Sequence, residues 1–194
     1  MIAKKGFTLI ELLVVVGILA VLATATTLIL NPAELLRQSR DSTRIADLAS
    51  LSNAIDLYLA DQESPALGTA SFCTNGAVTK SKKATPTACT QNQIRLVNGT
   101  GWVGVNFGAM TNGSPVPRLP LDPVSGTSTT ASTNCGAGLD ACFYQYIPDD
   151  TNKDYELNAS MESIKFSNNG VSDVELVDGG DNNQAYEIGS NLFL

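Results

Sequence analysis

Residues 4–30 read KKGFTLIELLVVVGILAVLATATTLIL, and this stretch decides the fold. From Phe7 to Leu30 the chain is almost wholly apolar, broken only by Glu11 and several threonines. As a helix, these 24 residues would reach roughly 36 Å, enough to cross a hydrocarbon core of about 30 Å. Because Lys4 and Lys5 precede the apolar run, the positive-inside rule keeps the N-terminus in the cytoplasm. We therefore expect a single pass through the cytoplasmic membrane, with the rest of the chain outside.

A second helix is expected directly after the apolar run. Asn31-Pro32 predicts a kink or break, because proline lacks a backbone N–H and disfavours helix in the residue before it. Residues 33–62 then show the apolar spacing of an amphipathic helix, with a stripe that includes Ile45, Leu48, Leu51, Ile55 and Tyr58. We assign the charged side chains of this helix to its opposite, solvent-facing surface: Arg37, Arg40, Asp41, Arg44, Asp47, Asp56 and Asp61.

The remainder of the chain has the pattern of short strands separated by turns. Residues 63–134 are rich in Gly, Ser, Thr, Asn and Pro, with 93–97 and 102–107 as short strands or loop anchors. Further on, strands are predicted at 142–147, 155–160, 163–167 and 171–177, followed by a polar loop with an apolar end at 178–194. The predicted fold class is α+β, a long N-terminal helix whose second half packs on a small antiparallel sheet.

Composition makes several functions improbable. The 194 residues carry a net charge of -7, which argues against sequence-independent binding of nucleic acid, since that needs a basic surface. The chain contains no histidine, the commonest general base and transition-metal ligand. We therefore expect no catalytic residues and no enzyme activity.

The four cysteines predict disulfides if the domain is exported. Four cysteines allow three connectivities, and we favour the two local pairs, Cys73 with Cys89 and Cys135 with Cys142, because each brackets a loop. The alternative is four reduced, buried thiols in a cytoplasmic protein. Zinc is disfavoured because no CxxC spacing occurs.

The junction between the lysines and the apolar run carries the functional prediction. Gly6-Phe7, with Glu11 four residues beyond Phe7 inside the apolar run, closely resembles the class III signal of type IV pilins and type II secretion pseudopilins. The resemblance implies that a prepilin peptidase cuts after Gly6 and methylates the new amine of Phe7. It also implies that Glu11 neutralises this amine in a neighbouring subunit during assembly. An acid inside a membrane span is costly, and is on that ground alone a functional candidate.

That resemblance implies a structural filament subunit. Its partners would be identical or related subunits, the prepilin peptidase, a membrane platform with an assembly ATPase, and the lipid bilayer. The assembled filament would lie outside the cytoplasm or at the cell surface. The domain division would be a leader at 1–6, an assembly helix at 7–30, its amphipathic continuation at 31–62 and a disulfide-bearing β head at 63–194. Whether the filament is a pilus or a secretion pseudopilus stays open.

Three alternatives compete with this interpretation. Ala23-Thr24-Ala25 follows an apolar segment in the layout of an ordinary secretory signal, and cleavage there would release a soluble domain. Glu11 could instead be a tolerated acid near the interface of a plain membrane anchor. The exported domain could also be an anchored binding module that holds a ligand or DNA through the loops of 64–134.

The head carries a weaker resemblance. Leu119-Pro120-Leu121-Asp122-Pro123, followed by Phe143-Tyr144-Gln145-Tyr146, resembles the loop and Tyr-x-Tyr strand of major pseudopilins and related pilins. Alternation places Tyr144 and Tyr146 on one face, against the helix. Major pseudopilins hold calcium in a C-terminal loop, so the resemblance implies a weak calcium candidate at Asp173, Asp178 and Asp181. Solvated turns are the favoured interpretation of these acids, and we expect no other cofactor.

Overall fold

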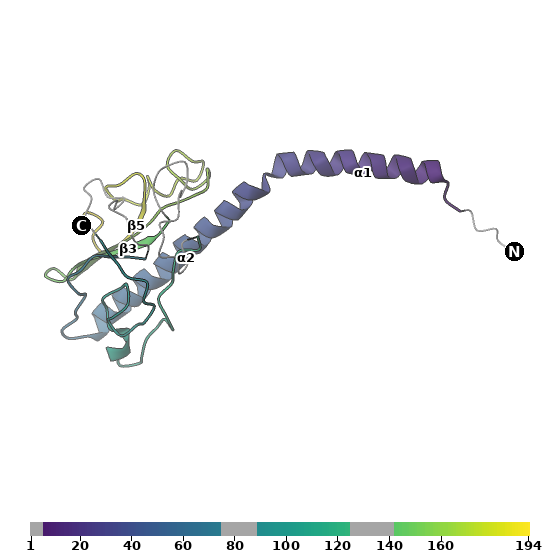
Figure 1. The fold of residues 1–194 in the computed structure, drawn as a ribbon. Helices are drawn as coiled ribbons and strands as arrows, with labels where there is room; N and C mark the ends of the chain where they lie inside the picture. The colour runs from purple at the N-terminus through teal and green to yellow at the C-terminus, as the bar shows by residue number, and fades with distance from the viewer. Residues whose placement is uncertain (1–5, 75–88, 125–141) are drawn as a thin grey trace. The chain divides into compact units, whose positions relative to one another are not determined.

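The computed structural model describes residues 6–74, 89–124 and 142–194, except the side chains of 27–30 (Figure 1). The chain forms two compact units, Met1–Leu36 and Arg37–Leu194. The described residues contain two helices, a short 3-10 turn and five strands, and the fold class is the α+β class that the sequence predicts.

The first helix, α1, covers Leu9–Leu30 and stops where the sequence predicts a break. Asn31 takes a left-handed conformation with φ of 39°, which residues such as Gly and Asn adopt at helix C-termini. Pro32 then begins α2, which runs to Asp61. Proline suits this first position because its missing N–H would have no partner in the helix there.

From Arg37 onward, α2 forms one side of the hydrophobic core. Leu48, Leu51 and Ile55 on the predicted stripe are fully buried, and Tyr58 is nearly so. They pack in one cluster with the sheet and with an irregular loop, whose buried side chains include Trp102, Val105, Phe107 and Leu119. Residues 102–107 form no strand. They contain one isolated bridge, at Asn106, and lead into the 3-10 turn η1, Phe107–Ala109, so this segment is a loop anchor.

The sheet has five strands in the order β2-β1-β3-β4-β5. Its centre is the antiparallel pair of β3, Tyr144–Asp149, and β4, Asp154–Ala159. The two-residue strands β1, Phe72–Cys73, and β2, Thr90–Gln91, extend one edge, and they pair parallel to each other. At the other edge, β5, Tyr186–Gly189, pairs antiparallel with β4.

The predicted placement of the tyrosines is confirmed. Tyr144 and Tyr146 are both fully buried in the core, and Tyr144 Oη donates a 2.8 Å hydrogen bond to Asp47 on α2. From β4, Tyr155 Oη donates to Asp56 Oδ1 at 2.7 Å and lies 2.8 Å from Ser52 Oγ. The sheet is therefore joined to α2 by hydroxyl groups as well as by apolar contact.

Two predicted strands are wrong, and the sequence did not predict β1, β2 or β5. Residues 163–167 and 171–177 form turns, because carboxylates there accept backbone N–H groups that a strand would give to a neighbour. Asp173 accepts from the amides of Asn169, Glu175 and Leu176. The strands β1 and β2 have only two residues each, too few for a periodic pattern. The strand β5 lies in the segment predicted as a polar loop, where Glu187 and the flanking polar residues hide its pattern.

Candidate functional site

The residues around the predicted processing point lie just before and inside the first turn of α1. Gly6 and Phe7 precede the helix, and Thr8 is its N-cap, with extended backbone angles of φ -80° and ψ 151°. The Thr8 hydroxyl accepts the backbone N–H of Glu11 at 3.3 Å. Helices begin in this way because their first N–H groups have no partner within the helix.

Glu11 completes a reciprocal capping box with Thr8. The backbone N–H and the hydroxyl of Thr8 both donate to Glu11 Oε2, at 2.9 Å and 2.7 Å. Within the described residues, Glu11 Oε1 accepts no hydrogen bond. The carboxylate is therefore held at the start of the helix by its own chain.

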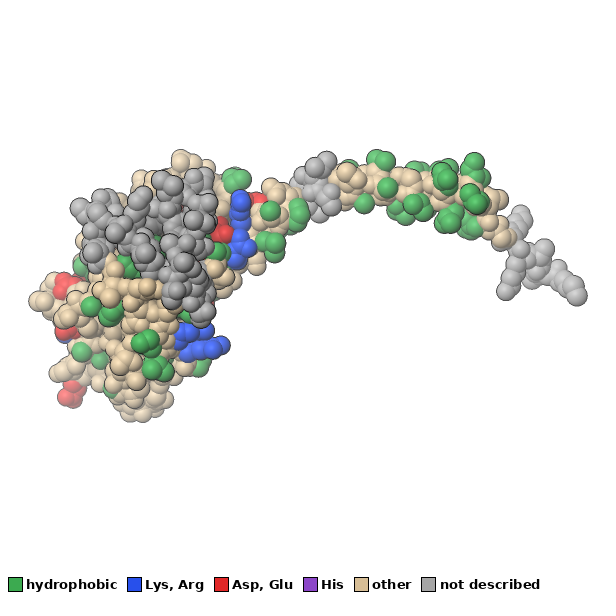
Figure 2. Space-filling model, in the orientation of Figure 1, with side chains coloured by type: hydrophobic (Ala, Val, Ile, Leu, Met, Phe, Trp, Pro, Cys, Tyr) green, Lys and Arg blue, Asp and Glu red, His purple; other side chains and the backbone are tan. Residues whose placement is uncertain are grey.

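The rest of α1 presents apolar side chains in every direction. Its large apolar residues between Phe7 and Leu22 are 47% to 81% exposed, and Figure 2 shows them as hydrophobic side chains along the helix. Leu9–Thr26 is long and apolar enough to cross a membrane. A helix that is apolar all round belongs in lipid or among other apolar helices, so this surface fits a membrane and a helix bundle equally well.

A comparison with known protein families finds a match in the same N-terminal segment. Residues 1–27 match the family model of the prokaryotic N-terminal methylation motif. This motif is the prepilin-type signature of type IV pilins and pseudopilins, and it covers Gly6, Phe7 and Glu11. No curated protein and no solved structure matches the chain. The methylation motif therefore identifies the N-terminal segment. The head has no such match, so its role is argued from its own geometry.

In the head, a buried cluster of charges joins α2 to two distant loops. Arg44 is fully buried and donates to Asp122 Oδ2 at 2.6 Å, to Asp41 Oδ1 at 2.7 Å and to Glu162. Arg40 adds a two-pronged contact to Glu162, through Nε at 2.9 Å and Nη2 at 2.6 Å. We call these five residues, Arg40, Asp41, Arg44, Asp122 and Glu162, the Arg44 cluster. It fixes residues 40–44 of α2 to the loops at 122 and 162.

The electrostatics of this cluster favour its charged form. Burial opposes the charge on Arg44, but the hydrogen bonds and charges of Asp122 and Glu162 outweigh it and raise the Arg44 pKa above its ordinary value. Burial likewise opposes ionisation of Glu162, yet Arg40 and Arg44 hold its pKa below the ordinary value. The sequence-based assignment of Asp41 and Arg44 to the solvent-facing surface is wrong. The helical pattern treats charges as exposed, whereas these are neutralised by loop residues far away in the chain.

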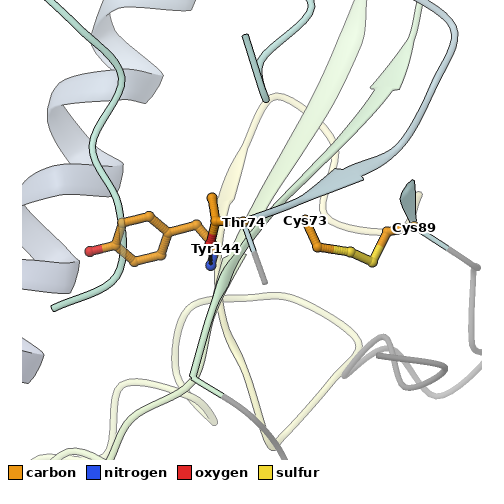
Figure 3. Close-up of a disulfide and its surroundings, with 4 residues drawn as sticks. All are labelled: Cys73, Thr74, Cys89 and Tyr144. Carbon is orange, nitrogen blue, oxygen red and sulfur yellow. Dashed lines mark hydrogen bonds between the residues drawn. A yellow bond between two sulfur atoms is a disulfide. The ribbon is translucent and has the colours of Figure 1, made fainter. Parts of the chain in front are cut away.

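The predicted pairing of Cys73 with Cys89 is present as a disulfide, with Cα atoms 5.7 Å apart. Figure 3 shows the disulfide on one side of the strand and the Tyr144 ring on the other, pointing to the helix. The disulfide lies beside Phe143 in a small apolar cluster. Cys142 is buried and disulfide-bonded, while Cys135, its predicted partner, lies outside the described residues.

The acids predicted as a weak calcium site serve mainly as caps of turns. Asp178 accepts the amides of Gly180 and Glu187, at 3.0 Å and 2.8 Å, and Asp173 caps the preceding turn. Asp181 is exposed. In the described ranges, no three His, Cys, Asp or Glu side chains are grouped so that they could hold a metal ion. Asp173, Asp178 and Asp181 are thus not gathered into a ligand set, and calcium binding stays a prediction.

Proposed function

We propose that this chain is a structural subunit of a type IV pilus-like or type II secretion filament, cut after Gly6 and assembled through α1. The observation that carries the proposal is a lone carboxylate, Glu11, capped by Thr8 at the start of an otherwise apolar helix within the methylation motif. An ordinary membrane anchor gains nothing from such an acid, because lipid disfavours charge.

Cleavage after Gly6 gives the carboxylate a partner. The cut creates an ammonium or methylammonium group on Phe7, and this cation is as unfavourable in lipid as Glu11. Pairing the Phe7 amine of one subunit with Glu11 of the next neutralises both charges and fixes the axial position of one α1 against another. Charge-assisted hydrogen bonds of this kind are strong in a medium of low dielectric.

Thr8 keeps the carboxylate ready for this exchange. In the single subunit, the Thr8 N–H and hydroxyl satisfy Glu11 Oε2, which lowers the cost of holding the acid in the membrane before assembly. Oε1 is the oxygen that the amine of the neighbouring chain would approach. The apolar sides of α1 would then exchange lipid for the α1 helices of other subunits.

The head would lie outside the cytoplasm and be carried by the filament core. Force on α1 would pass along the chain into α2 and from there to the head. The Arg44 cluster and the tyrosine contacts would keep α2 attached to the loops and the sheet under that force. The prepilin peptidase, a membrane platform and an assembly ATPase complete the set of proposed partners. No turnover is required of the subunit itself, since the mechanism is packing.

Replacing Glu11 by Gln tests the proposal, because the amide keeps the shape and removes the charge. We expect the variant to insert in the membrane and to be cut after Gly6, but to form few or no filaments by electron microscopy of sheared cells. Ile18→Leu is the matched control, a conservative change on the same helix that should leave filaments normal. Filaments of normal length and abundance from Glu11→Gln would refute the assembly role.

A further inference from the structure

A second buried group of acids in the head contains no basic side chain. Glu156 on β4 is fully buried and Glu187 on β5 is 2% exposed. Within the described residues, no Lys or Arg forms an ion pair with either carboxyl group, in contrast to the Arg44 cluster. Because an isolated charge is costly in a protein interior, burial without a cation favours the protonated form of an acid.

The two carboxyl groups lie close enough for a hydrogen bond between them. Two carboxylates cannot form such a bond, because an ionised carboxyl group has only acceptor oxygens. A third acceptor lies in the same row of the sheet, since Asn158 is directly opposite Glu187 in the register of β4 and β5. Asn158 Oδ1 and Glu187 Oε1 are both buried without a hydrogen bond. A proton on the pair supplies the donor that this group of acceptors lacks.

Two short stretches of the C-terminal region close over the pair. We call them the closing segments, residues 180–182 and 190–194. The backbone N–H of Asn182 donates to Glu187 Oε2 at 3.1 Å, and that of Leu194 donates to Glu156 Oε2 at 3.0 Å. Gly180 lies so close that a Cβ there would collide with the Glu187 carboxyl group. Two negative charges beneath this cover would repel each other with little water to screen them.

The other charged groups around the pair do not relieve this repulsion. They are acids: Asp154 on the same face of β4, Asp178 and Asp173 before β5, and the C-terminal carboxylate of Leu194. Lys153, next to Asp154 in the sequence, forms its ion pair with Asp150. On β3, the residues in register with the pair and its neighbour do not titrate: Ile147 and Gln145. Burial, together with the negative charges of Glu156 and Asp178, raises the pKa of Glu187 to about 8.

We propose that Glu156 and Glu187 share one proton in the folded head, and that this proton keeps the closing segments on the sheet. When the proton is lost to water or buffer base, two negative charges remain under the cover. The closing segments then open, so that both carboxylates become hydrated, and no covalent bond other than the O–H bond changes. Because the proposed place of the head is outside the cytoplasm, this contact would respond to the external pH.

The closed form holds its proton over a wider range of pH than the open form does. In the closed form Glu187 keeps the proton up to about pH 8, whereas the hydrated carboxyl group returns to its ordinary pKa of 4.5. Between these two values the closed form binds one proton more. Opening should therefore become up to about tenfold more favourable for each unit of pH, and should level off outside this window.

Hydrogen–deuterium exchange of the purified full-length protein in detergent, read by mass spectrometry, tests the proposal. The protection factor, which corrects for the intrinsic effect of pH on exchange, is compared from about pH 5 to about pH 8 for peptides that contain Asn182 or the C-terminus. We expect it to fall by up to about tenfold per pH unit. The amides of Glu162 and Ser163, which donate to Asp41, are the internal control and should keep their protection.

Glu187→Gln separates the shared proton from a merely structural contact. The amide of the glutamine carries N–H donors where the acid needs a proton, so the closing segments should stay protected up to about pH 8, without a pH dependence. Glu156→Gln should behave in the same way, which provides a second variant. Asp181→Asn, which removes an exposed acid of the same loop, should keep the pH dependence of the unmodified protein. Constant protection of the unmodified protein across this range, or an equal fall in the two glutamine variants, would overturn the proposal.

Discussion

Replacing Arg44 by Met removes the charge at the centre of the Arg44 cluster while keeping much of the side-chain volume. Arg44 is fully buried and contacts three carboxylates, those of Asp41, Asp122 and Glu162. Removing one partner of a buried ion pair costs about 3–5 kcal/mol, because it leaves charge buried and uncompensated.

The structure indicates the lower end of that range. In the variant, Asp41 would still accept hydrogen bonds from the backbone amides of Glu162 and Ser163, at 2.9 Å and 2.8 Å. Glu162 would still form its ion pair with Arg40. We therefore expect Arg44→Met to lower the free energy of unfolding by about 3 kcal/mol. That is a large fraction of the roughly 5–15 kcal/mol that stabilises a typical domain.

Urea unfolding of the full-length protein in detergent, followed through Trp102 fluorescence, measures this loss. Trp102 reports on the same core because its indole donates to Pro120 O, two residues before Asp122. With a urea dependence of about 1–3 kcal/mol/M, the midpoint should fall by roughly 1–3 M.

Arg40→Met is the matched control. The Arg40 side chain is 34% exposed and shares Glu162 with Arg44, so its loss should cost less than about 1 kcal/mol. Adding Asp122→Asn to Arg44→Met should recover part of the loss, since it removes one of the uncompensated charges. Equal destabilisation by Arg44→Met and Arg40→Met would show that the cluster does not stabilise the head as described.

Two further predictions concern the head. Because the Glu162 pKa lies below its ordinary value of 4.5, its ionisation stabilises the fold above that value and is lost as pH falls through the folded-state pKa. Unfolding followed through Trp102 fluorescence should therefore show that the free energy of unfolding falls in acid, and that it falls less in Glu162→Gln. Equal slopes of this free energy against pH in the two proteins would contradict the prediction. Replacing Cys73 and Cys89 by Ala opens a disulfide that joins residues 16 apart, and should lower the free energy of unfolding by about 2–4 kcal/mol. Unchanged urea midpoints would show that this disulfide adds no stability.

The helices were predictable because their signals are local. The apolar run, the Asn31-Pro32 break and the stripe of Leu48, Leu51 and Ile55 all lie within a few residues of what they determine. The central strands β3 and β4 were predicted within a few residues of their bounds, since apolar and aromatic residues alternate there and turn residues separate them.

The Arg44 cluster was not predictable from local patterns. Its contact with Asp122 spans 78 residues of sequence, and the amide of Glu162 reaches Asp41 across 121. Periodicity reports which face of a helix is apolar, but not which charged side chain will find a buried partner. Asp41 and Arg44 on α2 and Asp122 in the proline-rich loop can all be read in the sequence. No local pattern indicates that Arg44 and Asp122 are in contact. The acidic pair Glu156 and Glu187 escaped notice for the same reason, because β5 itself was missed.

The N-terminus of the mature protein tests the central claim most directly. Mass spectrometry of protein isolated from cell membranes and from sheared surface material should find Phe7 as the first residue, with a methylated amine. A chain beginning at Thr26 would show ordinary signal cleavage after Ala25 and release of a domain without its assembly helix. That result, or a chain that still begins at Met1, would contradict the account.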